Sequence, residues 1–158
     1  MFTAAQSAPL SFETFADTMP AVLHAHWART PRRNLEPSAN HPRVTFTDGL
    51  LGFGAHRSFV LAELDASAGL HALVAVDDVA MQLVLVDAAL AVTDYPLEEA
   101  RRAAAMTDEE VAVALVVVRP ADGRPATVNL RAPIVIGLSS LRGVQVILDG
   151  DLPFAAAM

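Results

Sequence analysis

The sequence predicts a mainly β fold: a small antiparallel barrel-like or sandwich domain with one or two short helices. From Arg43 onward, β-branched runs alternate with turn residues roughly every 8 to 12 positions, which is typical of antiparallel sheets. Several runs are apolar on both faces, which favours a closed barrel or a sheet pair covered on its outer side. A length of 158 residues fits a single hydrophobic core.

The first 42 residues differ from the rest because prolines interrupt them repeatedly. We therefore expect a Pro-rich extension over residues 1–42 and one domain over residues 43–158. Within the extension, Pro20–Arg29 is expected to form a helix, with Thr18 as its cap.

Eight segments carry the strand pattern. They are Arg43–Thr47, Arg57–Leu64, Leu70–Asp77, Gln82–Val86, Val111–Arg119, Ala126–Leu130, Ile134–Ile136 and Gly143–Leu148. Asp122-Gly123 supplies the positive φ angles of a tight turn, which predicts a hairpin between the fifth and sixth segments.

One segment, Pro96–Met106, has the pattern of a helix. It begins with proline, carries acids in its first turn and arginines further on, and has an alanine-rich body. Asp94 or Tyr95 is the expected cap. Thr107–Glu110 matches the capping box, which predicts one more helical turn before the next strand.

The composition excludes several kinds of chemistry. The chain has no cysteine, so it has no thiolate nucleophile or thiolate metal ligand. Its 11 basic residues are all arginine, which excludes a P-loop lysine and a Schiff-base lysine. The net charge of −7 argues against direct binding of nucleic acid and for a basic partner.

Neither export nor a membrane span is predicted. Met1–Pro20 has no basic residue and lacks the positive region of a secretory signal, and no apolar run approaches the ~20 residues that span a bilayer. We expect a cytoplasmic location.

No known catalytic or cofactor-binding motif is found in the sequence, and the segments that partly match one are better explained as turns or a helix. No Ser lies in a Gly-x-Ser-x-Gly elbow, and Gly49–Gly54 reverses the dinucleotide fingerprint, so it predicts a turn. Asp77-Asp78 likewise predicts a turn. His24 and His26 would share one face of a strand, but they diverge by about 200° on the expected helix. We expect no catalytic residue, no cofactor and no metal.

Two alternatives remain open at this point. One is a small ligand- or metal-binding barrel, or a divergent enzyme, that uses His24, His26 and a distant carboxylate. The other is a scaffold whose apolar strands assemble homo-oligomers.

Four phrases, in order over about 105 residues, resemble the FliW family of flagellar assembly factors. The first runs from Val44 to Phe53, with Phe46, Gly49 and Gly52 inside it, and is followed by Phe59-Val-Leu61. The second, Asp108-Glu-Glu-Val-Ala-Val113, is similar to the family's acidic turn entering a core strand. The third is similar to the family's Asn-Leu-x-Ala-Pro signature and reads Thr127-Val-Asn-Leu130-Arg-Ala132-Pro-Ile-Val-Ile136. The fourth is similar to the strand that follows this signature and reads Gly143-Val-Gln145-Val-Ile-Leu148.

The resemblance implies a barrel-like protein without catalytic activity. Members of the family bind flagellin in the cytoplasm and bind CsrA, a basic RNA-binding dimer, thereby relieving its repression of flagellin translation. We expect a monomer when free. The residues expected to contact partners are Glu98, Glu99, Asp108, Glu109 and Glu110 in the densest acidic zone, with Asn129 and Pro133 at a nearby rim. We expect the remaining motif residues to preserve the fold, with Phe46, Phe53 and Phe59 in a cluster at one end of the barrel. The Asn129 amide is also expected to bond to backbone groups at the corner that Pro133 fixes.

Overall fold

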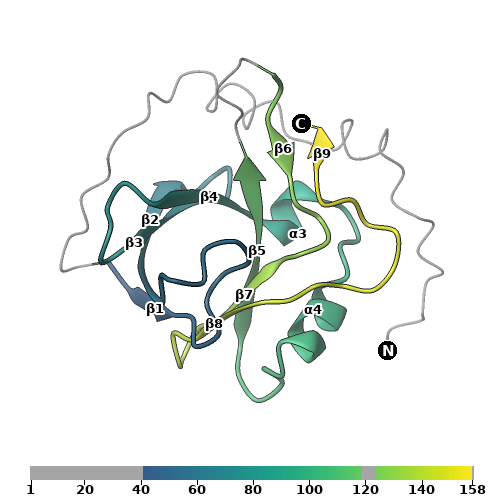
Figure 1. The fold of residues 1–158 in the computed structure, drawn as a ribbon. Coiled ribbons are helices and arrows are strands. Elements are labelled where there is room, and N and C mark those ends of the chain that lie inside the picture. The colour runs from purple at the N-terminus through teal and green to yellow at the C-terminus, as the bar shows by residue number, and fades with distance from the viewer. Residues whose placement is uncertain (1–40, 119–123, 158) are drawn as a thin grey trace.

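The protein is described by a computed structural model over residues 41–118 and 124–157. Its core is an antiparallel meander of five strands, each paired with the next. They are β1 (Arg43–Thr45), β2 (Ser58–Asp65), β3 (Leu70–Ala75), β4 (Gln82–Asp87) and β5 (Val111–Val118). Figure 1 shows this sheet curling into a barrel, with β5 running along its side.

Besides β4, the long strand β5 pairs with two further strands, one near each of its ends. Its end at Val117–Val118 pairs with β6 (Thr127–Val128), which pairs in turn with β9 (Ala156–Ala157). Its start pairs with β7 (Ile134–Gly137), and β7 pairs with β8 (Gly143–Gln145). The sheet therefore branches at β5 (Figure 1).

The barrel nearly closes between β1 and the turn before β8. The Thr45 N–H donates to the Leu141 carbonyl oxygen at 3.0 Å, and Thr45 forms a parallel bridge with Arg142. Gly143 lies directly against the ring of Phe46, where a Cβ atom would overlap the ring carbons. A side chain at position 143 would therefore push the two edges apart.

Two hydrophobic cores lie on opposite faces of this sheet. The inner core holds Phe46 and Phe59, whose rings meet edge to face at 5.5 Å, together with Leu73, Leu85 and Ile134. Each fully buried phenylalanine contributes roughly 1.5–3 kcal/mol by removing apolar surface from water.

The outer core is covered by two short helices, α3 (Ala88–Ala91) and α4 (Leu97–Ala103). Side chains alternate along β5: Leu115 and Val117 face the outer core and Val116 the inner one. This alternation explains why the strands are apolar on both faces, as the sequence predicted.

All eight predicted strands exist, with ends shifted by a few residues, and the predicted helix is α4. Two elements, α3 and β9, were not predicted. The expected helix at Pro20–Arg29 and the turn at Asp122-Gly123 lie outside the described residues. No helix in the described ranges is long and apolar enough to cross a membrane.

Three local predictions were wrong. The N-cap of α4 is Pro96, without a side-chain cap, and not Asp94 or Tyr95. Residues 107–110 form no helical turn, because Glu109 bonds to a distant loop. Phe53 does not join the other phenylalanines, since 43% of its surface is exposed.

Candidate functional site

The acidic zone surrounds α4. Glu98 and Glu99 lie in its first turn, where carboxylates interact favourably with the helix dipole, and Asp108, Glu109 and Glu110 lie in the link from α4 to β5. Glu98, Asp108 and Glu110 are exposed.

Arg101 fixes the path of this link. Its Nε donates to the Met106 carbonyl oxygen at 3.0 Å, and its Nη2 donates to the carbonyl oxygens of Thr107 at 2.9 Å and Glu109 at 3.1 Å. Its Nη1 lies 3.6 Å from Glu98 Oε1. The planar guanidinium suits this fork, because its donors have fixed directions.

Glu109 bonds within the protein. Its Oε2 accepts from the N–H groups of Ser139 and Ser140, and its Oε1 accepts from the Ser140 hydroxyl at 2.8 Å. These hydrogen bonds, above all those from Ser140, hold the pKa of the Glu109 carboxyl below its usual value. A Cβ at Gly137 would overlap Glu109 Oε1 and Ser140 Oγ, so a side chain at this position would displace their contact.

The rim around Asn129 is a tight corner between β6 and β7. Asn129 Oδ1 accepts from the N–H groups of Arg131 at 3.1 Å and Ala132 at 2.9 Å, as an Asx-type turn does. Pro133 is buried, and its carbonyl oxygen accepts from the Val146 N–H at 3.1 Å. The geometry thus gives both Asn129 and Pro133 structural contacts, and their contact with a partner stays a prediction.

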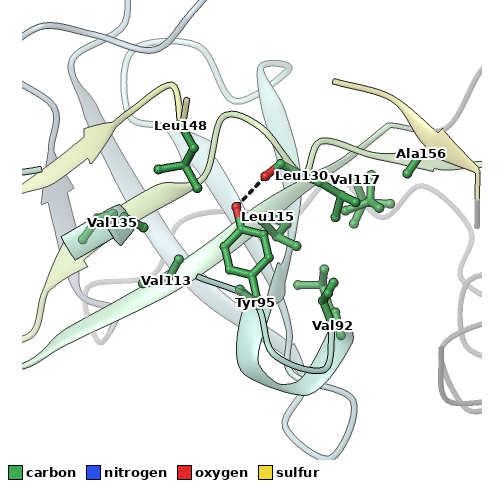
Figure 2. Packing of buried hydrophobic residues seen from close by; sticks show 14 of the residues in the cluster. Val92, Tyr95, Val113, Leu115, Val117, Leu130, Val135, Leu148 and Ala156 are labelled. Atoms are coloured by element: carbon green, nitrogen blue, oxygen red, sulfur yellow. Dashed lines mark hydrogen bonds between the residues drawn. The ribbon is translucent and has the colours of Figure 1, made fainter. Parts of the chain in front are cut away.

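A buried tyrosine joins the corner to the acidic zone. Figure 2 shows the Tyr95 hydroxyl pointing at the Leu130 carbonyl oxygen among side chains of the outer core. The hydroxyl donates to this oxygen across 2.5 Å. Burial, and to a smaller extent the charge of Glu99, raises the pKa of Tyr95 above its usual value. The phenol therefore remains a hydrogen-bond donor at physiological pH.

A pocket of about 330 Å³ lies between α4 and the start of β5. It is lined by Asp87, Ala89, Leu97, Glu98, Arg101, Glu110, Val111, Ala112 and Val113. It thus includes two of the five acids that the sequence singled out, Glu98 and Glu110.

No metal centre forms within residues 41–118 and 124–157. In these ranges no three His, Cys, Asp or Glu side chains gather closely enough to hold an ion. His24 and His26 lie outside the described residues.

A family model described as FliW protein matches residues 31–157. The chain belongs to the FliW family. Two relatives, both named Flagellar assembly factor FliW, are those of Carboxydothermus hydrogenoformans and Thermosipho africanus. The first is 28% identical over 113 residues, covering 69% of this chain and 73% of the relative. The second is 33% identical over 114 residues, covering 68% and 78%.

A solved structure, described as the crystal structure of the flagellar assembly factor FliW, has the same fold. It matches with a TM-score of 0.57 and 26% identity, over 78% of this chain and 89% of that one. The resemblance and the predicted fold class are thereby confirmed. The family match begins at residue 31, and the domain boundary at residue 43 stays a prediction.

The residues that resemble the FliW family lie in the core, in turns and where separate segments of this fold meet. Phe46, Phe59, Leu130 and Ala132 are buried, and Gly49 and Gly52 have φ angles of 72° and 82°. Gln145 bridges two loops, because its Oε1 accepts from the Leu51 N–H at 2.9 Å and its Nε2 donates to the Ala132 carbonyl oxygen at 3.1 Å. Gly143 permits the closure against Phe46.

Sequence reasoning missed the contact between His56 and Asp77. His56 Nδ1 lies 2.9 Å from Asp77 Oδ1, which joins the loop before β2 to the turn after β3. The hydrogen bond with His56 is the main cause that lowers the pKa of Asp77. Asp77-Asp78 was correctly predicted as a turn, in which Asp78 Oδ1 accepts from the Ala80 N–H. No local signal marks the pairing, since 21 residues separate the two partners.

Proposed function

We propose that this chain is a non-enzymatic flagellar assembly factor that binds flagellin and antagonises the translational regulator CsrA, thereby controlling flagellin synthesis in the cytoplasm. The observation that carries the proposal is the family match over residues 31–157, together with relatives named flagellar assembly factors.

The charge distribution supports a basic protein partner. The whole chain has a net charge of −7, and Glu98, Asp108 and Glu110 expose their side chains around α4. Opposite charges across an interface speed association and set its orientation. Glu109 is the least suited of the five acids to a partner, because Ser139 and Ser140 already engage its carboxylate.

The roles of the perturbed groups also support a binding protein. Tyr95 and Glu109 each have a shifted pKa, and in both cases the group makes a contact that holds two segments of the fold together. These shifts are therefore explained by contacts within the fold.

Titration calorimetry tests this proposal. The full chain is titrated with monomeric flagellin and, separately, with the CsrA-type regulator of the same organism, and saturable binding is expected for both. Absence of binding to both would overturn the proposal. Binding to flagellin alone would overturn the proposed antagonism of CsrA and would support the proposed binding of flagellin.

A further inference from the structure

The outer face of β2 and β3 carries four buried apolar side chains that belong to neither hydrophobic core. On β2, Val60 exposes 2% of its surface and Ala62 3%, and on β3, Ala72 exposes 2% and Val74 1%. Val60 lies opposite Val74, and Ala62 lies opposite Ala72. Among the described residues, the inner and outer cores include none of the four. These four residues, the β2–β3 face, therefore have a cover other than the two cores.

The direction of these side chains follows from their neighbours in each strand. Phe59 and Leu73 belong to the inner core. Because successive side chains along a strand point to opposite faces, Val60 and Val74 point to the outside of the barrel. Leu70, at the start of β3, belongs to the outer core. The β2–β3 face thus continues the outer core along the same side of the sheet, past the border of that core.

Small side chains occupy the middle of this face. Along the outer side of β3, Ala72 lies between Leu70 and Val74, and its partner across the ladder is also an alanine, Ala62. Folded proteins fill their interiors to a high density, so a gap over two methyl groups is closed by a neighbour. The cover is therefore expected to place one large apolar side chain over the alanine pair.

The chain that precedes β1 joins the sheet at the edge of this face. The Leu61 N–H donates to the Pro42 carbonyl oxygen at 2.9 Å, and Arg43 lies opposite Val60. The dozen residues between positions 29 and 41 can span up to about 40 Å when extended. Neighbouring strands are only about 4.8 Å apart, so residues 20–29 are within reach of β2 and β3.

Residues 20–29 have the apolar side chains that such a cover needs. The sequence predicts a helix there, and Leu23 and Trp27, four positions apart, share one face of a helix. The other internal segment outside the described ranges, residues 119–123, reads Arg-Pro-Ala-Asp-Gly and has no large apolar side chain. Residues 20–29 also precede the family match, which begins at residue 31, so the family fold does not account for them.

We propose that residues 20–29 pack across the β2–β3 face of their own chain, with the Trp27 ring over the pair of Ala62 and Ala72. This contact would keep four apolar side chains away from water and from other molecules, since exposed apolar patches favour association. The inference goes beyond the proposed function and does not depend on it, because both contacting surfaces belong to one chain.

Trp27 provides a direct probe, because it is the only tryptophan in the chain. In the full chain, its fluorescence should lie at shorter wavelength than in the urea-unfolded chain, and acrylamide should quench it less. Nuclear Overhauser contacts should join the Trp27 ring protons to the methyl groups of Ala62 and Ala72. In a mixture of isotope-labelled and unlabelled chains, these contacts should arise within one chain and should not depend on concentration.

Two variants of the covering segment form a matched pair. Leu23→Glu places a carboxylate beside Trp27, and it should lower the ratio of packed to released segment roughly tenfold or more, because an unpaired buried charge is costly. The Trp27 emission should then approach that of the unfolded chain. Ala21→Glu adds the same charge about 200° away around the helix and should leave the emission unchanged.

A second pair of variants changes the sheet. Val74→Glu adds a charge within the β2–β3 face and should release Trp27 as Leu23→Glu does. Val79→Glu is the control, because Val79 is 48% exposed in the turn after β3, and it should leave the emission of Trp27 unchanged.

Three results would overturn the inference. The first is a Trp27 in the wild-type chain that is quenched as strongly as in the unfolded chain. The second is a set of Trp27 contacts that go to another face or arise only between different chains, the latter indicating a second copy as the cover. The third is a Leu23→Glu variant with wild-type emission, which decides against the contact even where Val74→Glu fails to fold.

Discussion

The hydroxyl of Tyr95 donates to the carbonyl oxygen of Leu130 across 2.5 Å, which ties the connection between α3 and α4 to the corner that follows β6. The two residues are 35 positions apart, and both are buried. This one contact joins the helices around the acidic zone to the Asn129 corner, so it couples the two regions that the sequence singled out.

Replacing this tyrosine should destabilise the fold. Tyr95→Phe keeps the ring and leaves the Leu130 carbonyl oxygen buried without its donor, at a cost of about 1–3 kcal/mol. Urea denaturation should show a lower midpoint with an unchanged slope. A midpoint equal to that of the wild type would mean that the hydrogen bond contributes nothing net.

Glycine at position 105 should stabilise the end of α4. Ala105 has a φ of 54°, and Ala105 and Met106 donate to the carbonyl oxygens of Arg102 and Arg101 in a Schellman arrangement. The left-handed conformation costs an L-residue about 1–2 kcal/mol, so Ala105→Gly should raise the free energy of unfolding by about 0.5–1 kcal/mol. Ala103→Gly, inside the same helix, is the control and should lower it by about 1 kcal/mol. Thermal unfolding of both variants tests this prediction, and a loss of stability in both would contradict it.

A methyl group at position 143 should strain the barrel closure. Gly143→Ala places a Cβ atom in the ring of buried Phe46, and such overpacking costs about 1–3 kcal/mol. Gly54→Ala is the matched control, because a Cβ atom at position 54 would have no neighbouring atom within 4 Å. Chemical denaturation should separate the two variants, and equal midpoints would show that the closure adapts without cost.

The Glu109 contact should make stability depend on pH. Hydrogen bonds from Ser140 and Ser139 hold the pKa of Glu109 below its usual 4.5, so the unfolded chain binds this proton more readily than the folded chain. Its contribution is therefore complete above about pH 4.5 and is lost as the pH falls through the folded-state pKa. Between pH 6 and pH 3, the Glu109→Gln variant should lose less stability than the wild type.

Glu110, the exposed neighbour of Glu109, provides the control for this pH effect. Glu110→Gln should follow the wild-type profile in the same urea titrations. If Glu109→Gln and Glu110→Gln gave the same profile, the hydrogen bonds to Glu109 would have no energetic role.

The strands could be predicted because their residues are β-branched and their turns carry Gly, Pro and Asp, which are local properties. The corner at Asn129 could be predicted for the same reason, since its hydrogen bonds span two and three residues. The strand Ala156–Ala157 could not be predicted, because alanine has little strand preference. The pairing of this strand with β6 depends on the rest of the sheet.

The acidic zone shows where local reasoning fails. The spacing of Thr107 and Glu110 matches a capping box, yet the segment is shaped by partners elsewhere: Ser139 and Ser140 engage Glu109, and Arg101 holds three carbonyl oxygens. These long-range contacts outweigh one turn of helix, whose first hydrogen bond is costly to form. The pocket beside β5 arises likewise from the point at which β4 ends, which the sequence places only approximately.

Salt-dependent calorimetry can test whether the acidic zone around α4 binds the CsrA-type regulator. The wild-type chain and a Glu98→Lys, Glu110→Lys variant are compared at about 0.05 M and 0.5 M salt, since exposed charges are screened within a few ångströms at the higher concentration. We expect the variant to lose much affinity at low salt and less at high salt, because salt screens the exposed charges. Equal affinities of the two proteins at both salt concentrations would contradict it.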